Sequence, residues 1–545
     1  MKITIAQLNY HIGNFDGNLQ KMLSAIQDAI NHKSEIICFS ELSTCGYPPR
    51  DFLEFNDFIR MSEECIQILA SYSHQLGIIV GAPVRNPNVQ GKDLYNAALF
   101  LYLGKIQWVQ PKTLLPTYDV FDENRYFEPA TEYGFADIKG KRIAMTVCED
   151  IWNTGNDNPL YTTNPVDDLM TFNPDVIFNL SASPFSYNKS NERIKILKAN
   201  VIKYKLPIFY VNHCGAQTEL IFDGGSLVMS PDGRVYEELP YFEECIRTYE
   251  FSDVMIGRPQ QVQSMTIIEK IYHALIVGIR DYFRKLGLKK AILGLSGGID
   301  SAVTAVLAVR ALGPENVRAL LMPSHFSSDH SVEDARRLAE NLGIRYDILP
   351  IQDLYHRVTG ILEPLFEGTS FDVAEENIQS RIRGILNMAI SNKFGHILLN
   401  TSNKSEMAVG YGTLYGDLAG GLSVIGDVYK TQVYELADWI NKEGEIIPNH
   451  TITKAPSAEL RPHQKDSDSL PDYNILDQIL YCYIEERKGP MEIIALGFDE
   501  NLVRRVLRLV NLNEFKRYQT APVLRVSEKA FGMGRRMPIV GKYLV

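Results

Sequence analysis

The amino-acid sequence predicts an α/β protein of at least two domains, from its length and from the alternation of its apolar segments. At 545 residues the chain is too long for one ordinary hydrophobic core. Hydrophobic residues make up 45% of it and charged residues 22%, as is typical of globular proteins. Short apolar runs alternate with helical patterns, which predicts sheets covered by helices.

In the first half of the chain, short runs rich in β-branched and aromatic residues indicate strands. These runs are residues 36–39, 78–84, 142–147, 175–180 and 207–212, and residues 192–205 have the apolar spacing of a helix. The pattern lapses into a polar stretch with proline and glycine near residues 252–264. We therefore predict a first domain over 1–255, a linker over 256–264 and a second domain over 265–545.

The second half has a regular βαβ alternation. A long amphipathic helix is predicted over 265–287, a second helix over 331–343, and apolar strands over 292–295, 317–323 and 396–401. This order predicts a doubly wound parallel sheet with helices on both faces. The polar, proline-containing residues 455–473 predict a mobile loop.

Composition excludes several classes of function. The formal net charge of −11 argues against a general nucleic-acid binder. No apolar run approaches the ~20 residues that span a bilayer, and the N-terminal residues lack the layout of a signal peptide, so we expect no membrane partner and a cytoplasmic location. The seven cysteines have no CxxC spacing, which predicts neither a disulfide framework nor a zinc site.

The stretch 292-ILGLSGGIDSAV-303 joins a strand to a helix through glycine and serine. The N-terminus of a helix carries unpaired N–H groups, and a glycine-rich turn allows several of them to converge on phosphate oxygens. No Gly-Lys-Ser/Thr follows, so this is not a Walker A loop, and the dinucleotide pattern GxGxxG is absent too. An ordinary tight βα turn is the alternative.

The SGGxDS pattern resembles the pyrophosphate loop of the N-type ATP pyrophosphatases, which adenylate a substrate and release pyrophosphate. The resemblance implies ATP as co-substrate and Mg²⁺ as cofactor, with Asp300 as a metal ligand, since Mg²⁺ prefers carboxylate and phosphate oxygens. The residues that it assigns to ATP are Gly294, Leu295, Ser296, Gly297, Gly298, Ile299, Asp300 and Ser301.

A second run of residues distinguishes between members of the N-type ATP pyrophosphatases. Residues 396-HILLNTSNKSEMAVGYGTLYGDLAGG-421, with 376-ENIQSRIRG-384 and 426-GDVYKTQV-433, resemble NAD synthetases. By motif position, Thr401 and Lys430 would contact ATP, and Glu406 would join Asp300 on Mg²⁺. The resemblance assigns the substrate deamido-NAD to Asn377, Arg381, Glu406 and Lys516.

Three apolar runs in the first half each lead into a reactive residue: Glu41, Lys112 and Cys148. Their order and neighbours resemble the triad of the nitrilase superfamily, which implies an αββα sandwich over residues 1–255. Cleavage of an amide by cysteine needs thiolate character. Glu41 would act as the general base and acid, and Lys112 would favour the thiolate and stabilise the oxyanion. A lone cysteine after a strand is otherwise usually a core residue.

Members of that superfamily that use glutamine hold it with further side chains. By motif position these would be Tyr118, Glu149, Ser183 and Lys189. Residues 213–226 match the usual family pattern only loosely, which affects the detail of the pocket.

Both halves together resemble the family of glutamine-dependent NAD synthetases, nearly from end to end. The resemblance implies a ligase that hydrolyses glutamine to glutamate and ammonia, then amidates deamido-NAD through an adenylated intermediate, releasing AMP and pyrophosphate. It also implies a channel for ammonia and a homo-oligomer built on dimers of the synthetase domain, with octamers among the larger assemblies.

Three rival hypotheses remain, of which the residues 401–406 and 513–519 and the net charge argue against the first, and the intact Glu41, Lys112 and Cys148 set argues against the second. GMP synthetase, argininosuccinate synthetase and tRNA-modifying enzymes also carry SGGxDS loops but adenylate other acceptors. A binding or regulatory protein with an inactive nitrilase half is a rival from a different class. A third hypothesis is that free ammonia serves as well as glutamine.

Overall fold

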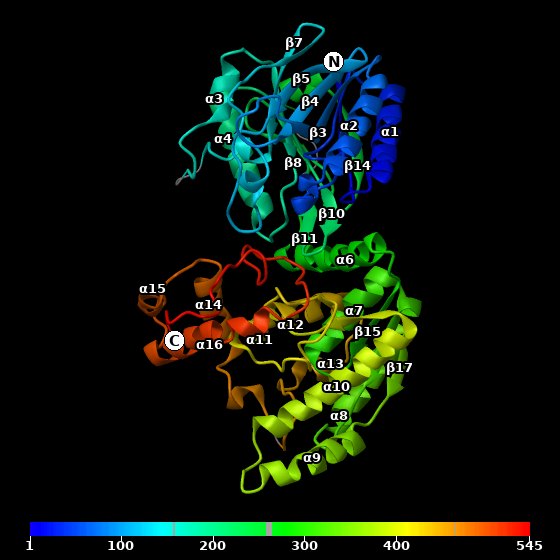
Figure 1. Ribbon diagram of the computed structural model, residues 1–545, viewed down its shortest axis with the longest axis vertical. Helices are drawn as coiled ribbons and strands as arrows, with labels where there is room; N and C mark the ends of the chain where they lie inside the picture. The colour runs from blue at the N-terminus through cyan, green and yellow to red at the C-terminus, as the bar shows by residue number, and fades with distance from the viewer. Residues whose placement is uncertain (156–158, 258–263, 463, 545) are drawn as a thin grey trace. The chain divides into compact units, whose positions relative to one another are not determined.

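The computed structural model describes residues 1–155, 159–257, 264–462 and 464–544. The chain divides into two compact units, Met1–Met265 and Thr266–Val545 (Figure 1). Helix α5 (Phe251–Ile256) ends where the predicted linker begins, and residues 258–263 of that linker lie outside the described residues.

The described part of the first unit contains two six-stranded sheets. The first has the order β14-β1-β2-β3-β4-β5 and the second β13-β12-β9-β8-β7-β6. The strands of the first sheet are β1 (Lys2–Gln7), β2 (Ile36–Cys38), β3 (Gly77–Arg85), β4 (Leu94–Tyr102), β5 (Lys105–Pro111) and β14 (Cys245–Glu250). Those of the second are β6 (Ala136–Ile138), β7 (Lys141–Val147), β8 (Val176–Ser181), β9 (Ile208–Asn212), β12 (Leu227–Met229) and β13 (Val235–Glu238). A separate hairpin pairs β10 (Cys214–Gln217) with β11 (Leu220–Asp223).

The two sheets pack face to face through one apolar core, in which the rings of Phe178 and Phe209 stack at 5.2 Å between centroids. Helices α1 (Phe15–Asn31) and α2 (Asn56–Ser71) pack on the other face of the first sheet. Helices α3 (Pro165–Met170) and α4 (Lys189–Tyr204) cover the second. The predicted αββα sandwich is confirmed, because each sheet buries both faces.

The second unit is built on a parallel sheet with the order β17-β16-β15-β18-β19, as predicted. Its strands are β15 (Lys290–Gly294), β16 (Val317–Leu321), β17 (Arg345–Ile348), β18 (His396–Asn400) and β19 (Leu422–Ser423). Helices α9 (Gln352–Phe366) and α10 (Val373–Phe394) share a core with β15, β16 and β18. Helix α7 (Ile299–Leu312) contacts β15 and β16, and also packs on α6 (Ile267–Lys285) and α12 (Lys430–Ile440).

The remaining helices complete the second unit. They are α8 (Asp329–Leu342), α11 (Lys404–Val409), α13 (Asn449–Thr453), α14 (Tyr473–Ile484), α15 (Pro490–Ala495), α16 (Glu500–Leu512) and α17 (Glu514–Arg517). Helices α11, α14, α15 and α16 share an apolar core of their own. Among the described helices, none has the length and apolar character needed to cross a membrane.

Predicted and observed boundaries differ by a few residues. The helix predicted over 265–287 is α6, which begins after Thr266 because Thr266 and Glu269 form a capping box. The helix predicted after the Gly/Ser stretch is α7, which begins at Ile299, directly after the glycine pair.

Candidate active sites

The first candidate site is built around Cys148, which follows the last residue of β7 and opens a short 3₁₀ turn. Its backbone has a φ of +42°, a conformation that non-glycine residues adopt only under constraint. The Asp150 carboxylate supplies that constraint, because Oδ2 accepts from the backbone N–H of Val147 and Oδ1 from those of Thr113 and Leu114, all at 2.9 Å. The turn is thereby tied to the chain that leaves β5.

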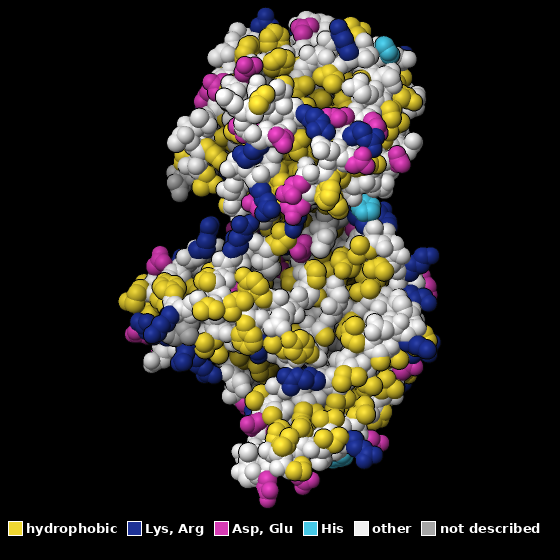
Figure 2. All heavy atoms as spheres, in the orientation of Figure 1, with side chains coloured by type: hydrophobic (Ala, Val, Ile, Leu, Met, Phe, Trp, Pro, Cys, Tyr) yellow, Lys and Arg dark blue, Asp and Glu magenta, His cyan; other side chains and the backbone are white. Residues whose placement is uncertain are grey.

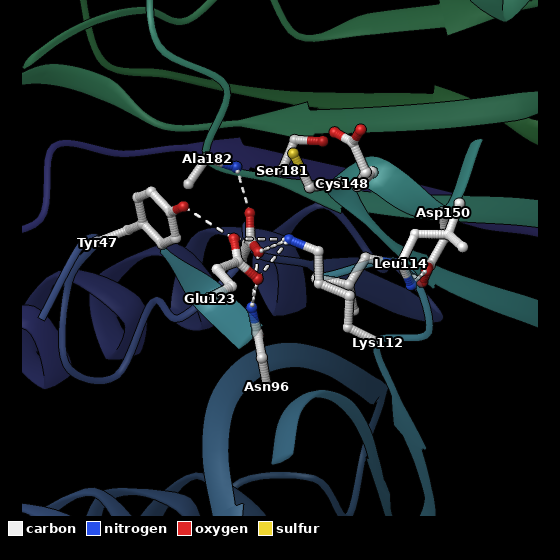
Figure 3. A network of polar contacts seen from close by, with 12 residues as sticks. Tyr47, Asn96, Lys112, Leu114, Glu123, Cys148, Asp150, Ser181 and Ala182 are labelled. Carbon is white, nitrogen blue, oxygen red and sulfur yellow. Dashed lines mark hydrogen bonds and ion pairs between the residues drawn. The ribbon is translucent and has the colours of Figure 1, made fainter. Parts of the chain in front are cut away.

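Two buried carboxylates hold the Lys112 ammonium. The distance from Nζ is 2.8 Å to Oε1 of Glu41 and 2.8 Å to Oε1 of Glu123. Asn96 donates to Glu41 at 2.7 Å, and the backbone N–H of Ala182 donates to its other oxygen at 2.9 Å. Figure 3 shows the Lys112 side chain reaching toward Glu123, with Cys148 above it. The structure therefore brings Glu41, Lys112 and Cys148 together.

Burial controls the ionisation of this cluster. It raises the pKa of the Cys148 thiol well above its ordinary value, and the charge of Glu41 raises it further while that of Lys112 opposes the shift. Burial also lowers the affinity of Lys112 for its proton, but the two carboxylates outweigh burial and raise its pKa. The resting sulfur is therefore a thiol beside a fixed cation, and forming the thiolate requires a base within reach.

Three residues of this cluster do not follow from the sequence: Asn96, Glu123 and Asp150. Glu123 ends the stretch 116-PTYDVFDE-123, where it looks like an ordinary loop carboxylate, yet only 4% of it is exposed. What identifies Glu123 as a residue of the site is its burial next to Lys112, and this burial can be seen only in the folded chain. Asp150 lies two residues from Cys148 and is equally inconspicuous in sequence.

Of the four residues predicted to hold glutamine, two are in direct contact with each other. Tyr118 donates its hydroxyl to the buried Glu149 carboxylate at 2.9 Å, so these two lie together next to Cys148. Ser183 is buried, and its backbone N–H donates to Asn212 Oδ1 at 2.9 Å. The Lys189 ammonium is paired with Glu192 at 2.9 Å.

The second candidate site is a cavity of about 460 Å³ at the C-terminal ends of the parallel strands, where ligands bind in such sheets. Most of the predicted ATP and deamido-NAD residues line it. They are Gly294, Leu295, Ser296, Gly298, Ile299, Asp300, Ser301, Asn377, Thr401, Glu406, Lys430 and Lys516.

Two predicted residues are absent from the described walls of this cavity: Gly297 and Arg381. Arg381 is exposed on α10 and donates from Nε to the carbonyl of Leu414 at 3.3 Å. Gly297 has a φ of +82°, and a Cβ there would lie 2.1 Å from the carbonyl oxygen of Ser331. Close approach of α8 therefore requires glycine at this position, which differs from the expectation that the glycine makes room for phosphate.

Opposite charges meet at the inner end of the Gly/Ser loop. The Lys430 ammonium forms an ion pair with Asp300 and lies 3.4 Å from Glu406 Oε1. Asn403 donates to the other oxygen of Asp300 at 2.8 Å. Burial and the charge of Asp300 raise the pKa of Glu406 to about 8. Two carboxylates in such surroundings form an oxygen donor set that a hard divalent cation would satisfy.

A third group lies near residues 410–413, which follow α11. Lys516 donates to the carbonyls of Gly410 and Gly412 at 2.7 and 3.0 Å, and burial lowers its pKa. Thr413 donates to Asn377 Oδ1 at 2.6 Å. The structure thus connects α10 and α17 to the same stretch of chain, residues 410–413.

The loop predicted over 455–473 borders this cavity. Glu459 accepts from Ser331 Oγ at 2.8 Å, and Asp466 accepts from the Tyr473 hydroxyl at 2.9 Å. Both side chains line the cavity, although sequence reasoning treated the segment only as a polar loop.

Comparison with known proteins covers both units. Residues 2–257 match the carbon-nitrogen hydrolase family and residues 271–520 the NAD synthase family. The chain is 45% identical to the glutamine-dependent NAD(+) synthetase of Synechocystis, over 98% of each chain. It is 40% identical to that of Thermotoga maritima, over 100% of this chain and 99% of that one.

A solved structure of a glutamine-dependent NAD+ synthetase from Acinetobacter baumannii, in complex with ADP, is also similar. It is 38% identical, has a TM-score of 0.79, and the match covers 99% of this chain and 98% of that one. The chain therefore belongs to the family of glutamine-dependent NAD(+) synthetases.

Proposed function

We propose that the chain hydrolyses glutamine at Cys148 and uses the ammonia to amidate adenylated deamido-NAD in its second unit. The activity of its family is glutamine-dependent synthesis of NAD⁺, a C–N ligase reaction, EC 6.3.5.1. One observation supports the assignment of residues to the two reactions. The same chain contains a buried cysteine–lysine–carboxylate cluster and a Gly/Ser loop with the Asp300–Lys430 ion pair at its end.

In the first site, Glu41 takes the proton of the Cys148 thiol while the sulfur attacks the side-chain amide carbon of glutamine. Lys112 stabilises the oxyanion, and Glu41 delivers the proton to the departing nitrogen, so that the C–N bond breaks and ammonia leaves. Glu41 then takes a proton from water, whose oxygen attacks the thioester. The thiolate leaves, recovers a proton, and glutamate is released.

Glutamine itself would be held by Tyr118, Glu149, Ser183 and Lys189. The carboxylate of Glu149 suits the substrate α-amino group, because it is buried and keeps two tyrosine hydroxyls, those of Tyr118 and Tyr161, as its donors. Lys189 would first have to leave its partner Glu192 to reach the substrate carboxylate.

In the second site, the nicotinate carboxylate of deamido-NAD attacks the α-phosphorus of ATP, and pyrophosphate leaves. The Gly/Ser loop, Thr401 and Lys430 would hold the phosphates, while Asn377, Arg381, Glu406 and Lys516 would orient deamido-NAD. Asp300 and Glu406 would hold Mg²⁺, which when bound neutralises phosphate charge. Ammonia then attacks the acyl carbon, and AMP and one proton are released.

ATP is the co-substrate that fits the loop, and a relative in this family was solved with ADP. The rival acceptors of related SGGxDS enzymes are set aside by the match to NAD synthases over residues 271–520. An inactive first half is disfavoured by the intact contacts of Lys112 with Glu41 and Glu123.

We also propose that the synthetase unit pairs with a second copy. Helices α9 and α10 leave large apolar side chains exposed, among them Ile361 at 69% and Leu365 at 77%. Figure 2 shows apolar side chains gathered over the part of the surface where these helices lie. A patch of this kind is typical of a protein interface. Ile361→Asp with Leu365→Asp should lower the sedimentation coefficient, and an unchanged coefficient would contradict pairing through this face.

The experiment that tests the proposed reaction measures NAD⁺ formed from deamido-NAD, ATP and Mg²⁺, with glutamine or ammonium chloride as the nitrogen source. We expect NAD⁺, AMP and pyrophosphate in equal amounts with either source, and one glutamate for each NAD⁺ with glutamine. Glutamate without NAD⁺ would overturn the assignment of the acceptor.

A further inference from the structure

Among the α10 residues that line the cavity are Arg383 and Asn387, which lie one helical turn apart. Arg383 Nε donates to the carbonyl of Met322 at 3.0 Å, next to the end of β16. Asn387 lies against the end of β15, with its Nδ2 3.4 Å from where a Cβ on Gly294 would be. Neither residue has a role in the reaction described above.

The carboxamide of Asn387 is nine-tenths buried, with only 8% of the residue exposed. Its Oδ1 is fully buried, and no hydrogen-bond partner for it exists among the residues that the structure describes. A buried acceptor without a partner destabilises the fold, so most such groups in proteins are satisfied. Asn387 also lines the ligand cavity, so a rotation of its carboxamide would bring this unsatisfied oxygen to a bound ligand.

Position and chemistry identify the part of the ligand that lies there. The phosphate loop begins at Ser296, two residues after Gly294, so a nucleotide whose phosphates lie on the loop can extend its base toward Asn387. The same cavity is lined by Leu320, Met322 and Leu398. Met322 Cε, like Asn387 Nδ2, lies within 3.4 Å of where a Cβ on Gly294 would be, so an apolar side chain that suits the face of a flat ring lies beside the carboxamide. A carboxamide offers one donor and one acceptor, the pair that matches the 6-amino group and adjacent ring nitrogen of adenine.

We infer that Asn387 reads the edge of the adenine base of ATP, with the Arg383–Met322 contact fixing the neighbouring wall. The inference rests on the proposed use of ATP in this cavity. Deamido-NAD also contains adenine, but the residues proposed to orient it include Asn377, near the opposite end of α10, and Lys516 on α17. The base read by Asn387 is therefore assigned to ATP.

The test is a cycle of two enzymes and two nucleotides, measured as ammonia-dependent NAD⁺ formation. The enzymes are the unaltered chain and Asn387→Leu, which replaces the polar atoms by methyl groups on the same branched skeleton. The nucleotides are ATP and purine riboside triphosphate, which lacks the 6-amino group. Asn392→Leu is the matched control, because Asn392 is exposed on the same helix.

We expect the unaltered chain and Asn392→Leu to prefer ATP over the analogue by about 10- to 100-fold in kcat/KM, the range for leaving one buried acceptor without its partner. Asn387→Leu should discriminate by less than about threefold, mainly through a higher KM for ATP, while its activity with the analogue shows that it is folded. The KM for deamido-NAD should stay unchanged.

Equal discrimination in Asn387→Leu and the unaltered chain would overturn the inference. A raised KM for deamido-NAD instead of ATP would overturn it too, because Asn387 would then read the dinucleotide. Failure of the proposed function has a different signature, since the unaltered chain would then form no NAD⁺ from ATP at all.

Discussion

The Lys112 ammonium offsets negative charge in the glutamine site, because it forms ion pairs with two buried carboxylates. If Glu41 were the only partner, the Lys112–Glu41 pair would be neutral, and only the charge of Glu41 would raise the pKa of Lys112. Glu123 adds a second negative charge and keeps Lys112 protonated, which is the state that an oxyanion needs.

Replacing Glu123 by Gln should therefore lower glutamine-dependent turnover by about 10²-fold or more, the scale of losing one preorganised electrostatic contact. Ammonia-dependent NAD⁺ formation should stay near normal, because Glu123 lies in the first unit. Glutamate release in steady state is the measurement. Glu64→Gln is the control, since Glu64 belongs to an exposed pair with Arg60. Full glutaminase activity in Glu123→Gln would show that Lys112 works with Glu41 alone.

The residue scale is also where prediction from the sequence is least complete. Cys148, Glu41 and Lys112 follow apolar strands, a pattern that can be read along the chain, and the fold brings all three together. Glu123, Asn96 and Asp150 have no such pattern, because their importance comes from burial and from partners distant in sequence. For Arg381 the motif predicts a ligand contact, which stays a prediction because its side chain is exposed on α10 and is not part of the described cavity wall.

At the scale of elements, the Gly/Ser loop and α8 depend on each other. Gly297 permits the carbonyl of Ser331, in the first turn of α8, to approach the loop backbone. Gly343 at the end of the same helix also has a positive φ, but no atom lies within 4 Å of its hypothetical Cβ. Alanine at Gly343 would therefore introduce backbone strain alone, whereas alanine at Gly297 would introduce backbone strain and a steric conflict.

We expect Gly297→Ala to reduce NAD⁺ formation from both nitrogen sources by at least about 10²-fold, because displacing the loop by a fraction of an ångström misplaces the reacting phosphate. Gly343→Ala should keep most of the activity, with a small loss of stability from left-handed strain. Both variants are assayed with ammonium chloride at saturating ATP. Comparable losses in the two variants would mean that φ strain, and not the approach of Ser331, explains the glycine.

The turn that carries Cys148 makes a second prediction at this scale, through pH. Burial raises the pKa of Asp150 to about 7 in the folded chain, although three backbone N–H groups oppose the shift. A carboxyl whose pKa is raised by folding stabilises the fold below its unfolded pKa of about 4, and that contribution is lost as pH rises through 7. The free energy of unfolding of the unaltered chain minus that of Asp150→Asn should therefore be larger at pH 5 than at pH 8.

The measurement is urea denaturation followed by tryptophan fluorescence in a Trp439→Phe background. The chain has three tryptophans, and the two that remain, Trp108 and Trp152, lie in the first unit and report its unfolding. The reverse order, a larger difference at pH 8, would mean that Asp150 is held as a carboxylate by its N–H donors.

The elements themselves are largely predictable from sequence, since strand and helix periodicities depend on local patterns of burial. Helix α6 is found within two residues of its predicted ends, and β15, β16 and β18 are where apolar runs predict them. What local pattern does not contain is the pairing of distant strands, such as β14 with β1 at the edge of the first sheet. The contacts of residues 455–473 with the second cavity are of the same kind, because they join segments far apart in the chain.

At the scale of the whole molecule, one chain combines a reaction that releases ammonia with a reaction that consumes it. In water at neutral pH, free ammonia is mostly ammonium, which is not a nucleophile. Housing both reactions in one protein therefore favours direct use of the ammonia, and the chain resembles its relatives over both units and not over one alone.

The most direct test of this assignment compares Cys148→Ala with the unaltered chain, each supplied with glutamine or with ammonium chloride. Cys214→Ala, a second buried cysteine of the first unit, is the control. We predict that Cys148→Ala loses NAD⁺ formation from glutamine by a factor of about 10⁴ or more and keeps that from ammonia. Glutamine-dependent NAD⁺ formation that survives in Cys148→Ala would contradict the assignment of the nucleophile, and with it the proposed division of the chemistry between the two units.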